Sequence, residues 1–232
     1  MTFYVGTSGF AFKEWKGTFY PKELPDDELL AHYAGRLSSV EINNTFYRLP
    51  KESVVADWAI KVPETFRFAV KASQRITHYG RLKDVDDVMG YFLKVVSTLG
   101  GKRGPTLFQL PPNMKKDLPR LQAFLPLIPN RWLAAIEFRH ESWFDEDVFQ
   151  ALRDRNVALC IADQADFEAP FVPTADWGYV RLHRLEYETP ALIAWAARLR
   201  EQPWEDTYVF FKHDEGKGSG PPGAEEFKQL LA

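Results

Sequence analysis

Val-Glu-Ile-Asn-Asn-Thr-Phe-Tyr-Arg, residues 40–48, shows the pattern from which the other strands of the chain are interpreted. The two-residue period of a β-strand gives it one largely apolar face and one polar face: Val40, Ile42, Asn44 and Phe46 against Glu41, Asn43, Thr45 and Tyr47. A buried polar group without a partner costs roughly 2–7 kcal/mol. This pattern therefore predicts a strand whose inner face lines a polar site in place of a plain hydrophobic core.

Strand-like and helix-like stretches alternate along the whole chain, which predicts α/β units around a parallel sheet. Strands are expected at residues 3–8, 40–46, 67–73, 106–110, 133–139, 158–163, 179–183 and 207–212. Helices are expected at 26–36, 53–61, 85–99, 118–127, 145–155, 190–200 and 224–231, with a loop or short turn at 167–177. Eight such units, in a chain near the usual barrel length of about 250 residues, predict a TIM-type (β/α)8 barrel.

The barrel is expected to form a single domain over residues 1–232. An open doubly wound sheet is the alternative, but the glycine-rich Gly-x-Gly-x-x-Gly motif that such folds carry after the first strand is missing here. The flexible stretch at residues 100–105 is interpreted as a loop, because it is short and precedes an expected strand.

Composition narrows the classes of function. The net charge of −3 gives no global electrostatic reason to bind nucleic acid or an anionic membrane, so any anion recognition must be local. The single cysteine, Cys160, excludes an internal disulfide framework and fits a reducing, cytoplasmic compartment. The first residues lack the features of a signal peptide, and no run reaches the roughly 18 apolar residues of a membrane span.

The same alternation, applied to every strand, places a set of polar residues inside the barrel toward the carboxyl ends of the strands. Barrel enzymes keep their chemistry at that face. Asp163 is the exception, since it shares its face with Leu159 and Ile161 and needs a bulge to point inward. The inward set is Glu41, Asn43, Lys71, Gln109, Glu137, Arg139, Arg181, His183 and Asp214.

The mixture of cations and carboxylates in this set predicts a pocket for a small phosphorylated or carboxylated substrate. Arg139 or Arg181 can grip such an anion through two parallel hydrogen bonds. Glu41, Glu137 and His183 are the candidates for moving protons, because burial and neighbouring charge tune such groups. Asn43, Lys71, Gln109, Arg139, Arg181 and Asp214 are the candidates for binding substrate.

Three alternatives remain open at this stage. The polar set can be a satisfied internal network, with Glu137–Arg139 or Glu41–Arg181 as buried ion pairs and no chemistry. A metal-dependent hydrolase of phosphoesters or nucleic-acid ends would use Glu41, Glu137, Asp163 and His183 as ligands, although the nearby cations oppose a metal. A non-catalytic module would sense a metabolite or dock a partner. The sequence assigns no cofactor.

Several ordered motifs resemble the YecE-like family, the domain of unknown function numbered seventy-two. They are Gly-Thr-Ser-Gly-Phe at 6–10, Trp15, Phe-Tyr-Pro at 19–21, residues 40–48, Phe-Ala-Val-Lys at 68–71, Ile-Thr-His at 76–78, Ile-Glu-Phe-Arg-His at 136–140, Ser-Trp at 142–143, Ala-Asp at 162–163 and Tyr-Val-Arg-Leu-His at 179–183. The resemblance implies a TIM-type barrel and supplies no reaction, cofactor or substrate. The chain departs from the family pattern at Lys-His-Asp, 212–214, where members usually show an Asn-Asn-Asp-like run.

Overall fold

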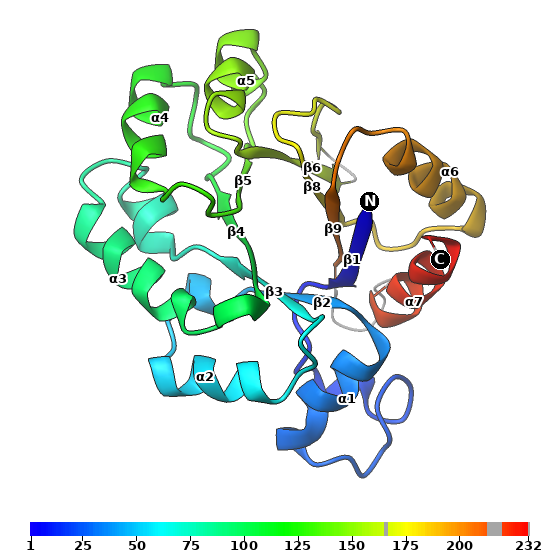
Figure 1. Cartoon of the computed structure of the whole chain (residues 1–232). Helices are drawn as coiled ribbons and strands as arrows, with labels where there is room; N and C mark the ends of the chain where they lie inside the picture. The colour runs from blue at the N-terminus through cyan, green and yellow to red at the C-terminus, as the bar shows by residue number, and fades with distance from the viewer. Residues whose placement is uncertain (165–166, 213–219, 232) are drawn as a thin grey trace.

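A ring of parallel strands forms the centre of the protein, and helices surround it (Figure 1). The computed structural model describes residues 1–164, 167–212 and 220–231. Eight parallel strands lie in the order β1-β9-β8-β6-β5-β4-β3-β2. Their bounds are β1 Thr2–Thr7, β2 Ser39–Ile42, β3 Arg67–Lys71, β4 Arg103–Gln109, β5 Ala134–Glu137, β6 Ala158–Gln164, β8 Gly178–Leu182 and β9 Asp206–Phe211. The predicted TIM-type barrel is confirmed.

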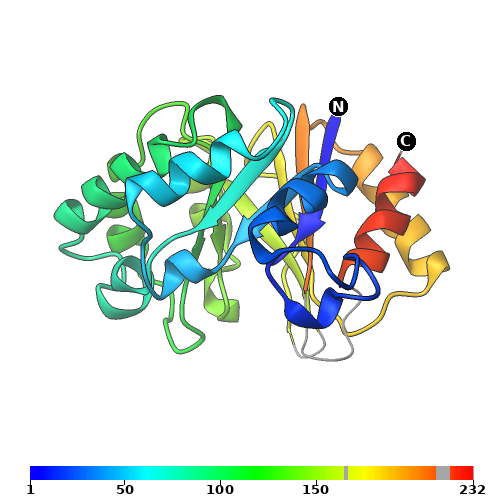
Figure 2. The ribbon, with the colours of Figure 1, turned by 90° about the horizontal axis from the view of Figure 1, so that it is seen from below.

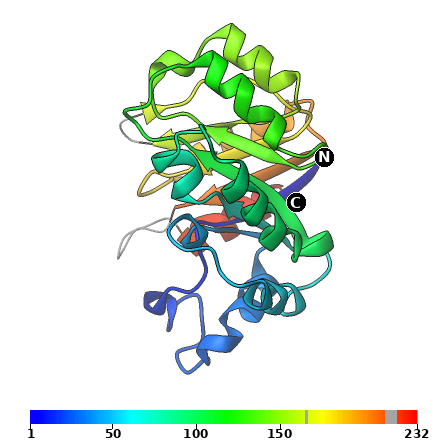
Figure 3. The same cartoon turned by 90° about the vertical axis from the view of Figure 1, so that its left-hand side faces the viewer.

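Seven α-helices of the described chain pack outside the strands, as Figure 3 shows from the side of α3 and α4. Several carry the charges and caps that favour helix ends. Asp117 accepts the backbone N–H of Arg120 at 3.1 Å at the start of α4, and α5 begins with Glu146 and ends with Arg153. The bounds are α1 Leu29–Arg36, α2 Glu52–Ile60, α3 Asp86–Ser97, α4 Leu118–Phe124, α5 Glu146–Arg153, α6 Thr189–Arg200 and α7 Gly220–Leu231.

Side chains from the strands divide into two buried layers, as the alternation predicts. The outer layer, between strands and helices, is aliphatic and aromatic and includes Val40, Phe68 and Ile136. The layer inside the barrel combines small residues with large rings: Ala69, Leu107, Ala135, Ala158, Cys160, Ala162, Trp177, Tyr179, Tyr208 and Phe210. Apolar side chains and aromatic rings therefore fill the middle of the barrel, with Arg67 over the Tyr4 ring at its amino end and a polar group of residues at its carboxyl end.

No backbone ladder joins β1 to β2 in the described chain, and the barrel closes there through one backbone hydrogen bond, from the Ser38 N–H to the Val5 carbonyl at 3.1 Å, and through side-chain hydroxyls. The Ser38 hydroxyl accepts the N–H of Val5 at 2.9 Å, and the Tyr33 hydroxyl accepts the N–H of Thr7 at 2.8 Å and donates to the carbonyl of Ser39 at 3.1 Å. Gly6 lies so close to Ser39 that an added Cβ would be 1.9 Å from its carbonyl oxygen. Two hydroxyls, one backbone hydrogen bond and one closely packed glycine therefore form the seam of the ring.

Two expected elements differ from the sequence prediction. The second strand ends at Ile42, and the chain enters a 3-10 turn at Asn44–Phe46, where the Thr45 hydroxyl contacts the carbonyls of Ile42 at 3.0 Å and Lys71 at 2.6 Å. The connection after β6 contains the two-residue strand β7 (Phe167–Glu168), which pairs antiparallel with β6, and no helix in its described part. The loop expected there is therefore correct apart from β7.

Candidate functional site

A polar cavity of about 380 Å³ opens at the carboxyl ends of the strands. In Figure 2 this is the end opposite to the two termini. Each of the eight parallel strands contributes its last residue, or one that follows within two positions: Ser8, Asn43, Lys71, Gln109, Arg139, Gln164, His183 and Lys212. Phe46, Tyr47 and Arg181 complete the lining.

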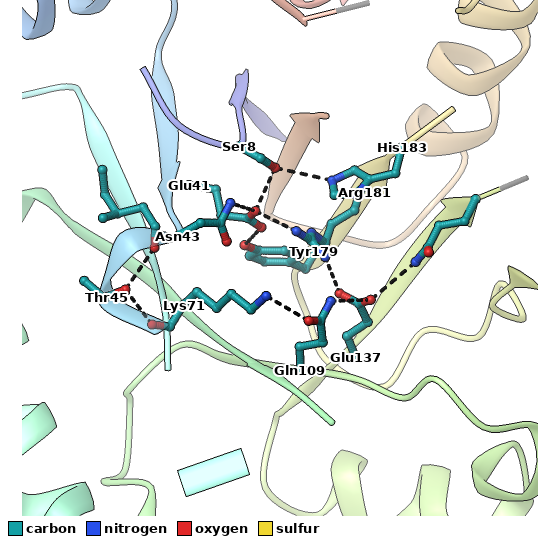
Figure 4. Close-up of polar contacts among 12 residues, drawn as sticks. Ser8, Glu41, Asn43, Thr45, Lys71, Gln109, Glu137, Tyr179, Arg181 and His183 are labelled. Carbon is teal, nitrogen blue, oxygen red and sulfur yellow. Dashed lines mark hydrogen bonds and ion pairs between the residues drawn. The ribbon is translucent and has the colours of Figure 1, made fainter. Parts of the chain in front are cut away.

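An ion-pair triad lies at the base of this cavity (Figure 4). The Arg181 guanidinium donates to Glu137 Oε2 at 2.5 Å and to Glu41 Oε1 at 2.9 Å. Both glutamates are 0% exposed and Arg181 is 4% exposed. The parallel register carries these side chains from β2, β5 and β8 to the barrel axis, so the predicted Glu41–Arg181 pair forms, whereas Glu137 pairs with Arg181 instead of Arg139.

Hydrogen bonds surround the Glu41 carboxylate. It accepts the hydroxyls of Tyr179 and Ser8, each at 2.7 Å, and the amide N–H of Asn43 at 3.0 Å. Burial opposes ionisation of Glu41, but the Arg181 charge, together with the hydrogen bonds from Tyr179 and Ser8, outweighs burial and lowers the pKa of Glu41 to about 2. Glu41 is therefore a stable anion whose lone pairs are largely taken up within the protein.

Gln109 connects the triad to Lys71. Its amide N–H donates to Glu137 Oε1 at 2.8 Å, and its carbonyl oxygen accepts from Lys71 Nζ at 2.8 Å. Because a carboxylate only accepts hydrogen bonds, Glu137 fixes the orientation of the Gln109 amide, and the amide oxygen must face the lysine. Lys71 also lies 4.4 Å from the centre of the Phe46 ring.

Lys71 has no carboxylate within ion-pair distance among the described residues. Burial, followed by the positive charge of Arg181, lowers its pKa to about 8. The carboxylates of Glu41 and Glu137 act in the opposite direction without offsetting this. At pH 7 Lys71 is therefore mainly protonated, with about a tenth present as the neutral amine.

His183 is a neutral imidazole at the same cavity. Burial and the Arg181 charge hold the pKa of His183 well below its usual range. Its Nε2 lies 3.3 Å from the Ser8 hydroxyl, which donates its proton to Glu41. Ser8 must then accept from His183, so the ring carries its proton on Nε2 and leaves Nδ1 as the acceptor.

The described lining of the cavity is cationic and contains no carboxylate. Lys71, Arg139, Arg181 and Lys212 belong to it, whereas Glu41 and Glu137 lie beneath it. Within the described chain the Arg139 guanidinium has no hydrogen-bond or ion-pair partner. Two further lining residues keep buried polar atoms unsatisfied, the Arg181 Nε–H donor and the Asn43 Oδ1 acceptor. Among the described residues the cavity surface therefore offers cationic donors and no carboxylate.

Not every predicted residue joins this cavity. The side chain of Asp163 points outward from the barrel, as the alternation predicts. Its carboxylate accepts hydrogen bonds from Arg184 Nε at 2.6 Å and from the Tyr187 hydroxyl at 2.9 Å. Among the described residues no group of three or more His, Cys, Asp or Glu side chains is placed to hold a metal ion, so the four ligands of the metal alternative are not assembled. Asp214 lies outside the described residues.

Several lining and supporting residues were not identified from the sequence as part of the site. Ser8 and Lys212 directly follow β1 and β9, and Gln164 ends β6, so a rule that searches the last residue of each strand and its successors finds them. The Tyr179 hydroxyl reaches Glu41 from inside the barrel. The alternation placed Tyr47 on the polar face but assigned Phe46 to the opposite face, and the 3-10 turn at Asn44–Phe46 breaks this alternation and brings both into the lining.

The fold and the cavity define the class of protein, a TIM-type barrel with a polar pocket at its carboxyl end. The family model described as "Protein of unknown function DUF72" matches residues 4–232. The chain belongs to this family, which confirms the resemblance found in the sequence.

Two curated proteins are similar to this chain in sequence. UPF0759 protein YecE of Escherichia coli strain K12 is 32% identical over 146 residues, which cover 60% of this chain and 54% of YecE. The match thus spans only about half the length of that relative. UPF0759 protein YunF of Bacillus subtilis strain 168 is 25% identical, with 98% of this chain and 93% of YunF covered.

Solved structures agree with the fold. The crystal structure of a DUF72 family protein from Thermotoga maritima superposes with a TM-score of 0.87 at 28% identity, covering 100% of this chain and 99% of the other. A DUF72 family protein from Enterococcus faecalis gives 0.83 at 20% identity, covering 99% and 95%. No helix in the described ranges is both long and apolar enough to span a bilayer.

Proposed function

We propose that this protein is an enzyme that binds a small phosphorylated or carboxylated molecule in the cavity at the carboxyl end of the barrel. The observation that supports the proposal is that positive and negative side chains lie at different depths in the barrel. Cationic side chains line the cavity, while the carboxylates that neutralise Arg181 lie beneath it. An anion entering the cavity therefore meets Arg139 and Lys71 without meeting a carboxylate of the described chain.

Each group has a distinct role in this proposal. Arg139, which has no partner in the described chain, binds the anionic group, and Asn43 and Gln109 position polar parts of the ligand. Glu41 and Glu137 act through Arg181, whose orientation they fix, without touching the ligand. Lys71 and His183 are the groups with shifted pKa values that face the cavity, and such groups are typical of catalytic sites.

Thermal denaturation in the presence of inorganic phosphate or pyruvate tests the binding. We expect either anion to raise the melting temperature of the wild type, relative to sodium chloride at equal ionic strength. Arg139→Gln should remove this increase. Arg153→Gln, which alters an arginine paired with Glu146 on α5, should retain it. Equal stabilisation of both variants, or none of the wild type, contradicts the proposal.

Turnover separates an enzyme from a binding module. Phosphate esters and sugar acids are incubated with the wild type and with both arginine variants. Turnover that is lost in Arg139→Gln and kept in Arg153→Gln supports an enzyme. Stabilisation by ligands without turnover of any of them supports a binding module and contradicts the enzymatic part of the proposal.

A further inference from the structure

The amine of Lys71 has a setting that differs from that of the other paired lysines of the described chain. Carboxylates on the surface contact Lys16, Lys61, Lys83, Lys94 and Lys116, and the exposed Lys228 donates to the carbonyl of Arg36. Lys102 is buried, but it donates to the carbonyls of Ala59 and Val62 and contacts Glu64. Lys71 instead contacts a neutral amide oxygen and an aromatic ring at the lining of a cavity.

We propose that Lys71 is a nucleophilic amine that forms a Schiff base with the carbonyl group of a small anionic aldehyde or ketone, such as a 2-oxo acid or a phosphorylated sugar. This inference rests on the proposed anion-binding pocket and names its substrate class. A lysine becomes a nucleophile when its surroundings are desolvated and cationic, because both favour the neutral amine.

Hydrogen bonding leaves the lone pair of Lys71 available. Glu137 fixes the Gln109 amide with its oxygen toward Nζ, so Gln109 accepts one N–H of the lysine and offers it no proton. A neutral amine in this position donates one N–H to Gln109, while its lone pair and its second N–H make no contact with Gln109. Gln109 thus holds the amine in place without adding a negative charge that would favour its protonated form.

The strand register places the expected anion-binding arginine above Lys71. Lys71 pairs with Leu107 of β4, and Leu107 pairs with Ala135 of β5. Arg139 lies four residues beyond Ala135, closer to the open end of the barrel, and lines the same cavity. A small molecule whose anionic group binds Arg139 can therefore direct a carbonyl group downward to Lys71.

The charges around Lys71 come from all sides of the barrel. The cationic groups disfavour protonation of the amine, and the glutamates are already paired with Arg181. The charged groups that shift the pKa of Lys71 are Arg181, Glu41, Glu137 and Arg139. The charge of Lys71 in turn lowers the pKa of His78 and of His183. The Phe46 ring face accommodates the positive charge of the product.

The reaction balances without an oxidant or reductant. The Nζ lone pair attacks the carbonyl carbon and a C–N bond forms. One proton from Nζ and one from solvent pass to the carbonyl oxygen, which leaves as water when the C–O bond breaks. The product is an iminium ion that keeps one N–H and carries the positive charge.

Trapping with borohydride tests the inference, since hydride reduces an iminium ion to a stable secondary amine. The full-length protein is incubated with pyruvate or dihydroxyacetone phosphate, reduced, digested and mapped by mass spectrometry. We expect one dominant modified peptide, containing Lys71. Neutral acetone and dihydroxyacetone should give at least about tenfold less adduct, because one lost ion pair of about 1.4 kcal/mol already costs tenfold in binding.

Variants and pH sharpen the result. Lys71→Arg should abolish the adduct, while Lys94→Arg, on the exposed face of α3, should leave it unchanged. Mapping of the wild type identifies the lysine even if Lys71→Arg fails to fold. At pH 7 the neutral fraction of an amine with the Lys71 pKa exceeds that of an ordinary lysine by more than about 100-fold, so adduct formation should rise to a plateau near pH 8 to 9.

The outcomes are distinguishable. Adduct spread evenly over exposed lysines overturns the inference. Absence of adduct from a protein that pyruvate still stabilises against heat overturns the Schiff base and leaves the anion pocket standing. Absence of both adduct and stabilisation overturns the inference and the proposed function together.

Discussion

Arg181 and Glu41 form an ion pair of 2.9 Å in which the carboxylate has no exposure to solvent. Glu137 binds the other side of the same guanidinium, so one arginine serves two buried anions. Removing the cation from such an arrangement leaves uncompensated buried charge, which is far more costly than losing a surface ion pair.

Arg181→Met is therefore expected to lower the free energy of unfolding by ~3–5 kcal/mol, measured by urea denaturation. Arg153→Met, which loses a largely exposed pair with Glu146, should cost less than about 1 kcal/mol. Adding Glu41→Gln and Glu137→Gln to Arg181→Met should recover part of the stability, because no buried carboxylate then lacks a cation. Similar small losses for the two arginine variants would show that the triad is not a structural unit.

Acid stability should depend on Glu41. Its pKa of about 2 in the folded protein lies below its ordinary value of 4.5. A carboxyl group whose pKa is lowered on folding stabilises the folded protein. This stabilisation is complete at pH values above the ordinary pKa and is lost as the pH falls toward the pKa in the folded protein. The difference between the two pKa values of Glu41 corresponds to ~3 kcal/mol in the free energy of unfolding. Glu41→Gln should flatten the decline in urea midpoint between pH 4.5 and 2, whereas Glu23→Gln at an exposed position should preserve it.

The close approach at the barrel seam predicts the effect of a single methyl group. In Gly6→Ala the added Cβ would lie 1.9 Å from the Ser39 carbonyl oxygen, so β1 and β2 must separate and the variant should melt well below the wild type. Gly90→Ala, inside α3 with nothing within 4 Å of the new Cβ, should gain ~0.5–1 kcal/mol from helix propensity. A Gly6→Ala variant as stable as the wild type would exclude the close approach.

The Tyr33 hydroxyl joins the same seam, and its removal leaves the Thr7 N–H and the Ser39 carbonyl without this partner. Tyr33→Phe should cost ~1–3 kcal/mol in chemical denaturation, the usual penalty for buried groups left without a hydrogen bond. Tyr91→Phe, at a half-exposed position on α3, provides the control and should be nearly neutral. Equal behaviour of the two variants would argue that Tyr33 contributes through its ring alone.

Anion binding should weaken as the pH rises through the pKa of Lys71, about 8. Above that value the free protein loses one positive charge from the cavity lining. Sulfate is a suitable probe for calorimetry because its own charge is constant over this range. Its affinity should fall between pH 7 and 9 in the wild type and in Lys94→Gln, and should be flat in Lys71→Gln. A wild-type affinity independent of pH would contradict a role for the Lys71 charge in binding.

Strand alternation identified much of the site because it depends only on the period of the backbone. Lys71, Gln109 and Arg181 come from strands far apart in the sequence, and each faces the barrel interior as predicted. The depth of each side chain could not be predicted in the same way. Glu41 lies below the cavity and Asn43 lines it, although they are two residues apart, about 6.6 Å along a strand.

The sequence also could not predict which arginine pairs with the two buried glutamates. Arg139 and Arg181 follow the same rule of alternation, yet only Arg181 reaches both carboxylates. The difference arises from strand register and from which neighbours already satisfy a given carboxylate, and both are properties of the assembled ring. The turn that carries Phe46 and Tyr47 into the lining likewise depends on Thr45 contacting the carbonyl of Lys71 in the next strand.

The six-residue ladder between β1 and β9, from Thr2 with Asp206 to Thr7 with Phe211, joins the first and last strands of the ring. During synthesis on the ribosome, β1 emerges long before its ladder partner exists. The intervening strands can pair with sequence neighbours as they appear, while β1 meets the start of β2 through the backbone hydrogen bond from Ser38 to Val5 and the hydroxyls of Ser38 and Tyr33. The ladder that fixes β1 therefore forms only once β9 is available, and this closure, which encloses Ser8 beside Glu41, joins the pair of strands that lie farthest apart in the sequence.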